Sequence, residues 1–453
     1  MFIAILLLFT VSVALFVLSG LFNRAPSGQL RSSLIAQTMA VTIGALIKLS
    51  ILLIFNYTNF EIASLFDSIA NFSFALGGAI GLSIMTYIRT GKWSRIFLFI
   101  TLFSLLPTYG IIFCSLIWFA IPILIAMIAS ADRDPQMRIK LQTIQAGTIG
   151  GGLLFVFIAF LRFFDQTPLG MEIVGPLMSV LFIYAGLNVH NDPENEFYYP
   201  EVITLVKTGL VILFSISFLP FLLLDQHNGL ILIKFLLSAF NLITCFILLL
   251  LFMHFDSASI KTFFVLLILA IMPEIGVHLY SEQLEVFLQN SLHLISRTFL
   301  VMSCLFILKQ YLRWGFEIVQ SMVMLITAVS AASIVFLVIY IFEPSLPLSK
   351  LFTEEKILHD GFLFMNFVVL FSLPPVLLNY SLGTMRVTWS ILTLGVFLVV
   401  YSDFLPTEII CYEHNVSELI GTSLIMLAFM TLWRYINSMI QKIHSLAQTF
   451  DEK

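Results

Sequence analysis

Long apolar runs recur along the whole chain, and they constrain its fold more than any other feature. They fall at 2–22, 34–55, 62–88, 94–107, 110–130, 143–164, 171–189, 202–224, 230–253, 262–279, 287–308, 318–342, 361–380, 388–402 and 417–436. A helix needs roughly 20 apolar residues to span a bilayer, and in lipid only helices or closed barrels satisfy every backbone polar group. Because the runs are continuous rather than alternating, the sequence predicts an all-α polytopic membrane protein with 14 or 15 transmembrane helices.

The scarcity of charge supports this prediction. Only 11% of the residues are charged and 60% are hydrophobic, whereas a soluble domain carries about 25% charged residues. The chain therefore has too few charges to cover a surface that faces water, and the lipid bilayer is its first predicted partner. The net charge of −4 says nothing about nucleic acid, but no basic tract is present, so nucleic acid is not a predicted partner.

The basic residues lie in alternate short loops. They are Arg24, Arg31, Arg89, Lys92, Arg95, Arg133, Arg138, Lys140, Lys309, Arg313 and Arg386. Cytoplasmic loops are enriched in Lys and Arg, and all these residues fall on one side if the N-terminus is outside. Acidic loops near Glu61, Glu282 and Glu285 then fall on the opposite side. The predicted topology places the C-terminus in the cytoplasm.

Ionisable side chains inside the apolar runs are the candidate functional residues. Each costs several kcal/mol in hydrocarbon unless it meets a partner or a water-filled cavity. They are Lys48, Asp67, Arg162, Lys207, Lys234, Glu274, His293 and Arg297. Arg162 and Lys234 lie near run ends, where long side chains can extend to the membrane surface. Lys48 lies in mid-run, either on an ion pathway or in a structural ion pair.

His293, Arg297 and Glu274 have the chemistry that a proton pathway needs. His293 and Arg297 are four residues apart and so share one helix face. Histidine titrates near neutral pH, which suits a proton relay; the alternative is a pair that anchors helix packing. Glu274 follows Pro273, which removes a backbone hydrogen bond and permits a kink. This acid either holds a proton or caps the opened turn.

Two proline-containing polar stretches are candidate helix breaks. The first is HNDPENEFYYPE, with Pro193 and Pro200, and the second is EPSLPLSKLFTEEKIL, with Pro344 and Pro347. Hydropathy alone makes the second an outside loop. Alternatively it is a broken helix whose free backbone groups line an aqueous cavity, as in transporters. In that case Glu354 and Lys356 join the candidate ion pathway.

No enzyme, cofactor or metal motif is present. The chain lacks GxGxxG, HExxH, GxSxG and a Walker A loop, and its four cysteines are scattered without metal-ligand spacing. We therefore predict a protein that is not an enzyme and has no cofactor and no bound metal.

Several sequence motifs follow one another along the chain in a distinctive order. FDSIANFSFALGGAIGLSIMTYIR opens with an aspartate and ends in a tyrosine before a basic loop. TLVKTGLVILFSISF contains Lys207, FDSASIKTFFVLL contains Asp256 and Lys261, SLHLISRTFLVMSCLFIL contains His293, and LPLSKLFTEEKIL precedes NYSLGTMR. In this order they resemble the antiporter-like membrane subunits of NADH–quinone oxidoreductase, with their relatives in multisubunit cation/proton antiporters and DabB-type inorganic-carbon transporters.

The resemblance implies a fold and a proton path. It implies two inverted five-helix repeats, each with a broken helix and a chain of buried Lys, Glu and His residues. Lys207, His293 and the Glu354–Lys356 region would inherit these roles. The implied division is N-terminal helices at 1–90, repeats at 91–224 and 225–387, and C-terminal helices with a cytoplasmic tail at 388–453. The implied location is the bacterial inner membrane, within a complex of several subunits.

Differences from the family pattern indicate which branch of the family the chain resembles more. The family's fifth-helix glutamate has no counterpart in IWFAIP, which disfavours a respiratory pumping subunit. The neighbourhood of Trp118 and Asp132–Arg133 is more similar to the DabB-type branch, which works beside a cytosolic zinc-containing subunit. Arg297 stands where the family has a second histidine, and arginine cannot release a proton in a protein.

Three functions remain open from the sequence. The first is an ion-coupled membrane subunit that translocates protons or cations and energises inorganic-carbon uptake with a soluble partner. The second is a membrane scaffold that does not conduct, and the third is an independent secondary transporter or flippase.

Overall fold

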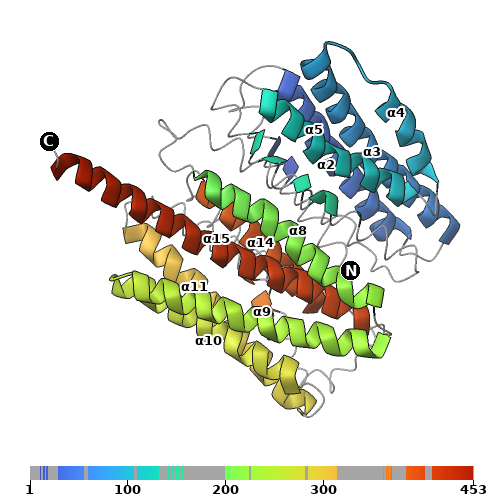
Figure 1. The fold of residues 1–453 in the computed structure, drawn as a ribbon. Coiled ribbons are helices and arrows are strands. Elements are labelled where there is room, and N and C mark those ends of the chain that lie inside the picture. The colour runs from blue at the N-terminus through green and yellow to red at the C-terminus, as the bar shows by residue number, and fades with distance from the viewer. Residues whose placement is uncertain are drawn as a thin grey trace. The chain divides into compact units, whose positions relative to one another are not determined.

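The fold consists of helices throughout the part of the chain that can be described. A computed structural model describes residues 29–55, 60–106, 110–131, 199–223, 226–280, 284–313, 384–403 and 411–451, with single positions in 11–18, 141–156 and 361–369 (Figure 1). Within these ranges every regular element is an α-helix or a 3₁₀ helix. The predicted all-α class is confirmed.

The helix bounds follow the apolar runs closely. The helices are α2 (Gln29–Phe55), α3 (Phe60–Thr90), α4 (Ile96–Thr101), η1 (Leu102–Leu105), α5 (Gly110–Ala131), α8 (Pro200–Leu223), α9 (Gln226–His254), α10 (Ala258–Tyr280), α11 (Val286–Arg313), α14 (Thr384–Asp403) and α15 (Cys411–Asp451). Among the described residues, seven helices are long and apolar enough to cross a membrane. The chain is an integral membrane protein.

The run at 94–107 forms less helix than its hydropathy predicts. Only α4 and η1 are helical there, six and four residues long, which is about 17 Å of helix against a hydrocarbon core of about 30 Å. Leu106 is already extended, with ψ 124°. The residue before a proline is disfavoured in the helical conformation, and Pro107 follows Leu106. The predicted spanning helix is therefore replaced by a short one.

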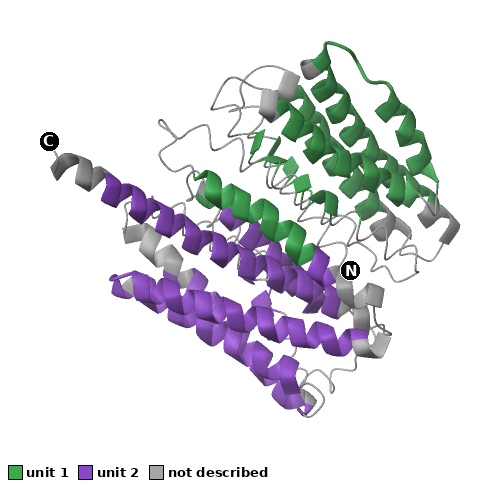
Figure 2. Ribbon diagram, in the orientation of Figure 1, with its two compact units in different colours: residues 1–214, 382–387 green, residues 215–381, 388–453 purple. Residues whose placement is uncertain are grey.

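Two compact units divide the chain, and each is described by itself (Figure 2). Unit 1 comprises Met1–Phe214 with Leu382–Val387, and unit 2 comprises Ser215–Ser381 with Thr388–Lys453. In unit 1, α3 packs against both α2 and α5; in unit 2, α10 packs against α9 and α11, and α15 packs against α9. The inverted repeats, with their boundaries at 91–224 and 225–387, stay a prediction.

Small residues allow close helix contacts in unit 1. A Cβ atom added to Gly44 of α2 would lie 2.5 Å from the ring of Phe74 in α3. The backbone carbonyl of Phe74 accepts a hydrogen bond of 3.2 Å from the indole N–H of Trp118 in α5. Small residues let helix backbones approach closely in a membrane, where dispersion contacts take the place of the hydrophobic effect. These contacts join α2, α3 and α5.

A glycine pair brings α14 and α15 together in unit 2. A Cβ atom added to Gly395 would lie 2.8 Å from the carbonyl oxygen of Gly421, and one added to Gly421 would lie 2.8 Å from that of Gly395. The two backbones are therefore in direct contact. Their approach also positions Glu418, which lies one turn before Gly421 on α15.

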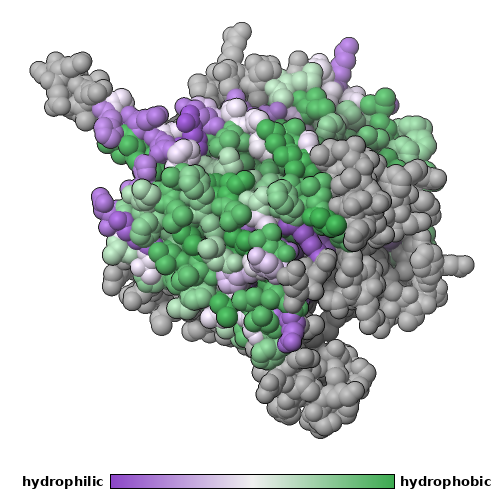
Figure 3. All heavy atoms as spheres, turned by 60° about the horizontal axis from the view of Figure 1, so that its bottom comes forward, coloured by the Kyte–Doolittle hydropathy of each residue, from purple (hydrophilic) through white to green (hydrophobic). Residues whose placement is uncertain are grey.

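Large apolar side chains cover the outside of α9 and α10. Figure 3 brings this side of the molecule forward, and most of the described surface in view is hydrophobic. On α9, Phe246 is 61% exposed and Leu242 is 53% exposed; on α10, Met272 is 54% exposed. A soluble monomer rarely exposes a large continuous apolar patch. This surface faces lipid.

We expect a charge on the lipid-facing surface of α9 to impair insertion and folding. Arginine at the centre of a spanning helix costs about 2.5–3.5 kcal/mol, so Leu242→Arg should reduce the amount of monodisperse protein recovered from membranes. The matched control is Ile443→Arg, because Ile443 is 57% exposed and lies between Lys442 and His444 near the end of α15. Equal recovery of the two variants would contradict the assignment of this surface to lipid.

Candidate ion-binding site

Arg297 of α11 lies at the centre of a buried polar cluster in unit 2. Its side chain is only 5% exposed. Its Nη1 donates to Oε1 of Glu274 on α10 at 3.0 Å, and its Nη2 donates to Oδ2 of Asp403 on α14 at 2.8 Å. Its Nε donates to Oδ1 of Asn366 at 2.7 Å, and Asn366 in turn donates to Asp403 at 3.0 Å. The guanidinium thus links four segments of the unit.

Glu274 lies between the two basic residues of α11. Its Oε1 accepts from Arg297, and its Oε2 is 3.0 Å from Nδ1 of His293. That second contact has the distance of an ion pair without the angle of a hydrogen bond. Since His293 and Arg297 are one helical turn apart, one carboxylate on α10 faces both. α10 continues through Pro273 to Tyr280, so Glu274 lies within a helix and caps no helix end.

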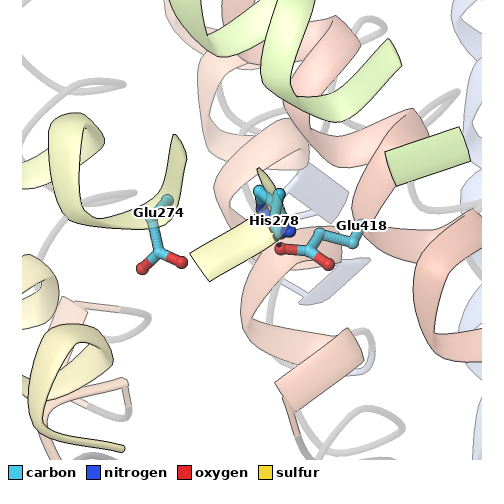
Figure 4. A group of neighbouring side chains, drawn as sticks. All are labelled: Glu274, His278 and Glu418. Atoms are coloured by element: carbon cyan, nitrogen blue, oxygen red, sulfur yellow. Dashed lines mark ion pairs between the residues drawn. The ribbon is translucent and has the colours of Figure 1, made fainter. Parts of the chain in front are cut away.

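A second His–Glu pair lies one turn farther along α10. Nε2 of His278 is 3.1 Å from Oε1 of Glu418 on α15, and both side chains are under 10% exposed. The donor atoms of Glu274, His278 and Glu418 all lie within 4.8 Å of one another. In the view of Figure 4, the imidazole lies between the two carboxylates.

The cluster opens onto a cavity within unit 2. The cavity has a volume of about 90 Å³. It is lined by Glu274, His278, Arg297 and Glu418, with apolar side chains and with Asn241, Ser296, Ser303, Cys304 and Thr422. A site of this size has room for a few water molecules, and its polar groups can hydrogen-bond to them. Most of the cavity wall is apolar, so water molecules inside it would have hydrogen-bond partners only at these polar groups.

The charge of the cluster depends on the protonation of its two imidazoles. We define the unit 2 charge cluster as Glu274, His278, His293, Arg297, Asp403 and Glu418. Its three carboxylates and one guanidinium leave two net negative charges when both imidazoles are neutral, and none when both imidazoles are protonated. A buried charge is costly unless it is compensated. The cluster therefore has the composition of a site that takes up protons or a cation.

No protein-family model, curated protein or solved structure matched the chain.

The predicted site residues of unit 1 form small sites of their own. Nζ of Lys48 on α2 is 2.7 Å from Oδ1 of Asp67 on α3, which fits the structural ion pair left open by the sequence. Nζ of Lys207 on α8 donates to Oε1 of Gln145 at 2.7 Å. The structure thus pairs one lysine with an acid and the other with a neutral amide.

Of the predicted residues of unit 2, three meet and one does not. Glu274 contacts both His293 and Arg297. Lys234 is partly exposed in α9, two turns from its start, and is not among the residues that line the cavity.

The predicted helix breaks are largely untested. Glu354, Lys356, Pro193, Pro344 and Pro347 lie outside the described residues. Pro200 is the first residue of α8, a position where the missing N–H of proline costs nothing.

Sequence reasoning missed three ionisable members of the cluster. Asp403 lies one residue beyond the apolar run 388–402, and Glu418 lies at the start of the run 417–436. His278 lies at the end of its run, four residues after Glu274. That spacing was an available signal because it places both side chains on one helix face.

We expect Arg297→Gln to destabilise unit 2. Removing one partner of a buried ion pair costs about 3–5 kcal/mol because the other charge stays buried and uncompensated. The variant should therefore melt at a lower temperature than the wild type in detergent. Arg297→Lys should fall between them, since lysine keeps the charge but loses the planar fork.

The matched control is Arg95→Gln, because Arg95 is exposed before α4. An exposed substitution of this kind changes stability by about 0.5 kcal/mol or less. If Arg297→Gln melted together with Arg95→Gln, the central role of Arg297 in packing would be disproved.

Proposed function

We propose that the chain translocates protons or small cations across the membrane through the unit 2 charge cluster. One observation carries the proposal: Glu274, His278, Arg297 and Glu418 line a cavity inside a bundle of apolar helices. Ionisable groups in such a place are costly, and they typically mark ion pathways and proton relays. With neutral imidazoles the cluster has a net negative charge, which favours the uptake of positive charge.

The two His–Glu pairs supply groups that can exchange protons. Arg297 keeps its charge at all accessible pH values, so it serves as a fixed counter-charge for Glu274 and Asp403. His293 faces Glu274, and His278 faces Glu418. Imidazoles change protonation state near neutral pH. A proton that enters the cavity thus meets acceptors that lie within a few ångströms of one another.

The proposed orientation, membrane and partner subunits rest on the sequence. The basic loops support an N-terminus outside and a C-terminus in the cytoplasm. The resemblance to antiporter-like subunits supports a bacterial inner-membrane complex with further subunits. Its DabB-type branch supports inorganic-carbon uptake beside a cytosolic zinc-containing subunit.

A second candidate function is a membrane scaffold that does not conduct. The contacts of Arg297 favour it, because Glu274, Asp403 and Asn366 together occupy its Nε, Nη1 and Nη2 atoms. A guanidinium satisfied in this way also holds helices together. The two candidates differ in whether charge moves through the cluster.

We expect Glu274→Gln and His278→Gln to lower proton flux by about tenfold or more, since each removes a group that exchanges protons. Flux is measured in proteoliposomes with an internal pH-sensitive dye and an imposed potassium diffusion potential. His254→Gln is the matched control, because His254 is exposed at the end of α9. Unchanged flux in folded cluster variants would refute translocation and favour the scaffold.

Lys207→Ala tests whether unit 1 contributes a pathway, as the resemblance implies. Lys207 is half-buried and donates to Gln145. If it relays protons, its removal should reduce flux while leaving the amount of folded protein unchanged. Lys442→Ala is the control, because Lys442 is exposed near the end of α15. Full flux in Lys207→Ala would restrict the pathway to unit 2.

A further inference from the structure

We propose that Glu274, His278 and Glu418 form a binding site for a divalent transition-metal ion. The sequence predicts no metal site, because the three residues come from two helices separated by about 140 positions along the chain. The fold brings their donor atoms within 4.8 Å of one another in a buried position. This inference goes beyond proton translocation and does not depend on it.

The donor set suits a transition metal. One imidazole nitrogen and two carboxylate oxygens are ligands of Zn²⁺, Mn²⁺, Fe²⁺ and Co²⁺, whereas Mg²⁺ and Ca²⁺ prefer oxygen ligands alone. Nε2 of His278 and Oε1 of Glu418 are 3.1 Å apart. Ligand atoms about 2.0–2.1 Å from a tetrahedral ion lie about 3.3 Å from one another. The first two donors are already at chelating distance. The third donor, from Glu274, lies within 4.8 Å of both and would have to move closer to bind the same ion.

The backbone fixes the arrangement of these ligands. Glu274 and His278 are four residues apart on α10, the spacing that places two zinc ligands on one helix face in the HExxH motif. Glu418 comes from α15, which the Gly395–Gly421 contact holds against α14. Ligands on helices are better positioned than ligands on loops.

The cavity leaves room for an exchangeable ligand. All three residues line it, so an ion bound by them would keep a coordination position open to water. Three protein ligands with one open position are typical of accessible metal sites, and four protein ligands of structural ones. Arg297, which donates to Oε1 of Glu274 at 3.0 Å, would orient that carboxylate from outside the coordination sphere.

The charge of the cluster matches a divalent ion. With neutral imidazoles the cluster carries two net negative charges, which one divalent ion cancels. A neutral imidazole is also the form that ligates a metal. The rival explanation is a simple ion pair between His278 and Glu418 that holds α10 against α15. It needs no metal, and a binding experiment separates the two.

The experiment titrates the full-length chain with Co²⁺ in detergent after treatment with a chelator. Co²⁺ reports its coordination by visible absorption, and Zn²⁺ should displace it whereas Mg²⁺ should not. The wild type is expected to bind one Co²⁺ per chain. His278→Gln, Glu418→Gln and Glu274→Gln should each weaken binding by more than about tenfold, and His254→Gln should bind as the wild type does.

A variant that gains a new absorption band shows that loss of Co²⁺ binding in the other variants does not simply reflect misfolding. His278→Cys replaces the imidazole with a thiolate, another good ligand for Co²⁺. It should bind Co²⁺ with a new thiolate-to-cobalt charge-transfer band in the near ultraviolet. Because Cys304 lines the same cavity, both proteins carry Cys304→Ser in this test. The protein with His278 should then lack the band, because no described cysteine is among the three ligands.

Two results would overturn the metal site: no Co²⁺ binding by the wild type, or binding by His278→Gln that equals that of the wild type. The assay uses no membrane potential and measures no flux. A failed metal site would therefore leave proton translocation standing, and loss of translocation would leave metal binding standing.

Discussion

A permanently charged guanidinium inside a membrane protein is the constraint on which the rest of unit 2 depends. Arg297 cannot discard its proton to escape the low-dielectric interior. The fold must therefore bring counter-charges to it, and it brings Glu274 from α10 and Asp403 from α14. Asn366 completes the set by bonding to both Arg297 and Asp403. The packing of these segments around α11 follows from the need to compensate one charge.

The two units differ in how many acidic side chains surround a buried positive charge. In unit 1, Lys48 faces Asp67 at 2.7 Å, so one positive charge meets one negative charge. In unit 2, Arg297 forms ion pairs with two acidic side chains, Glu274 and Asp403. A third acidic side chain, Glu418, lies next to His278. Protonated imidazoles or a bound cation can compensate the excess negative charge. An ion pair of the first kind fits a structural role, whereas an unbalanced cluster beside a cavity fits one that exchanges charge.

The sequence predicted the features that depend on local hydropathy. It did not predict the features that depend on contacts between distant segments. The apolar runs predicted α9, α10 and α11 within a few residues, because span length depends only on local hydropathy. Glu274, His293 and Arg297 were found because a charge inside an apolar run stands out. Hydropathy did not register the local conformational effect of Pro107, which ends η1 early. It also passed over Asp403 and Glu418, since only tertiary packing shows that charges at the ends of runs turn inward.

Protons and a divalent ion would compete for one set of side chains in these proposals. His278 and Glu418 serve either as a proton-exchanging pair or as two ligands of a metal, because an imidazole nitrogen that binds a metal cannot also hold a proton. Arg297 changes in neither state, so the total charge of the site is the same with two protons as with one divalent ion. Exchange between these states would move the Glu274 side chain, while the contacts of Arg297 with Asp403 and Asn366 could stay in place. The cluster can thus vary in occupancy while Arg297 stays paired with Asp403 and Asn366, which reconciles the paired guanidinium with a role in moving charge.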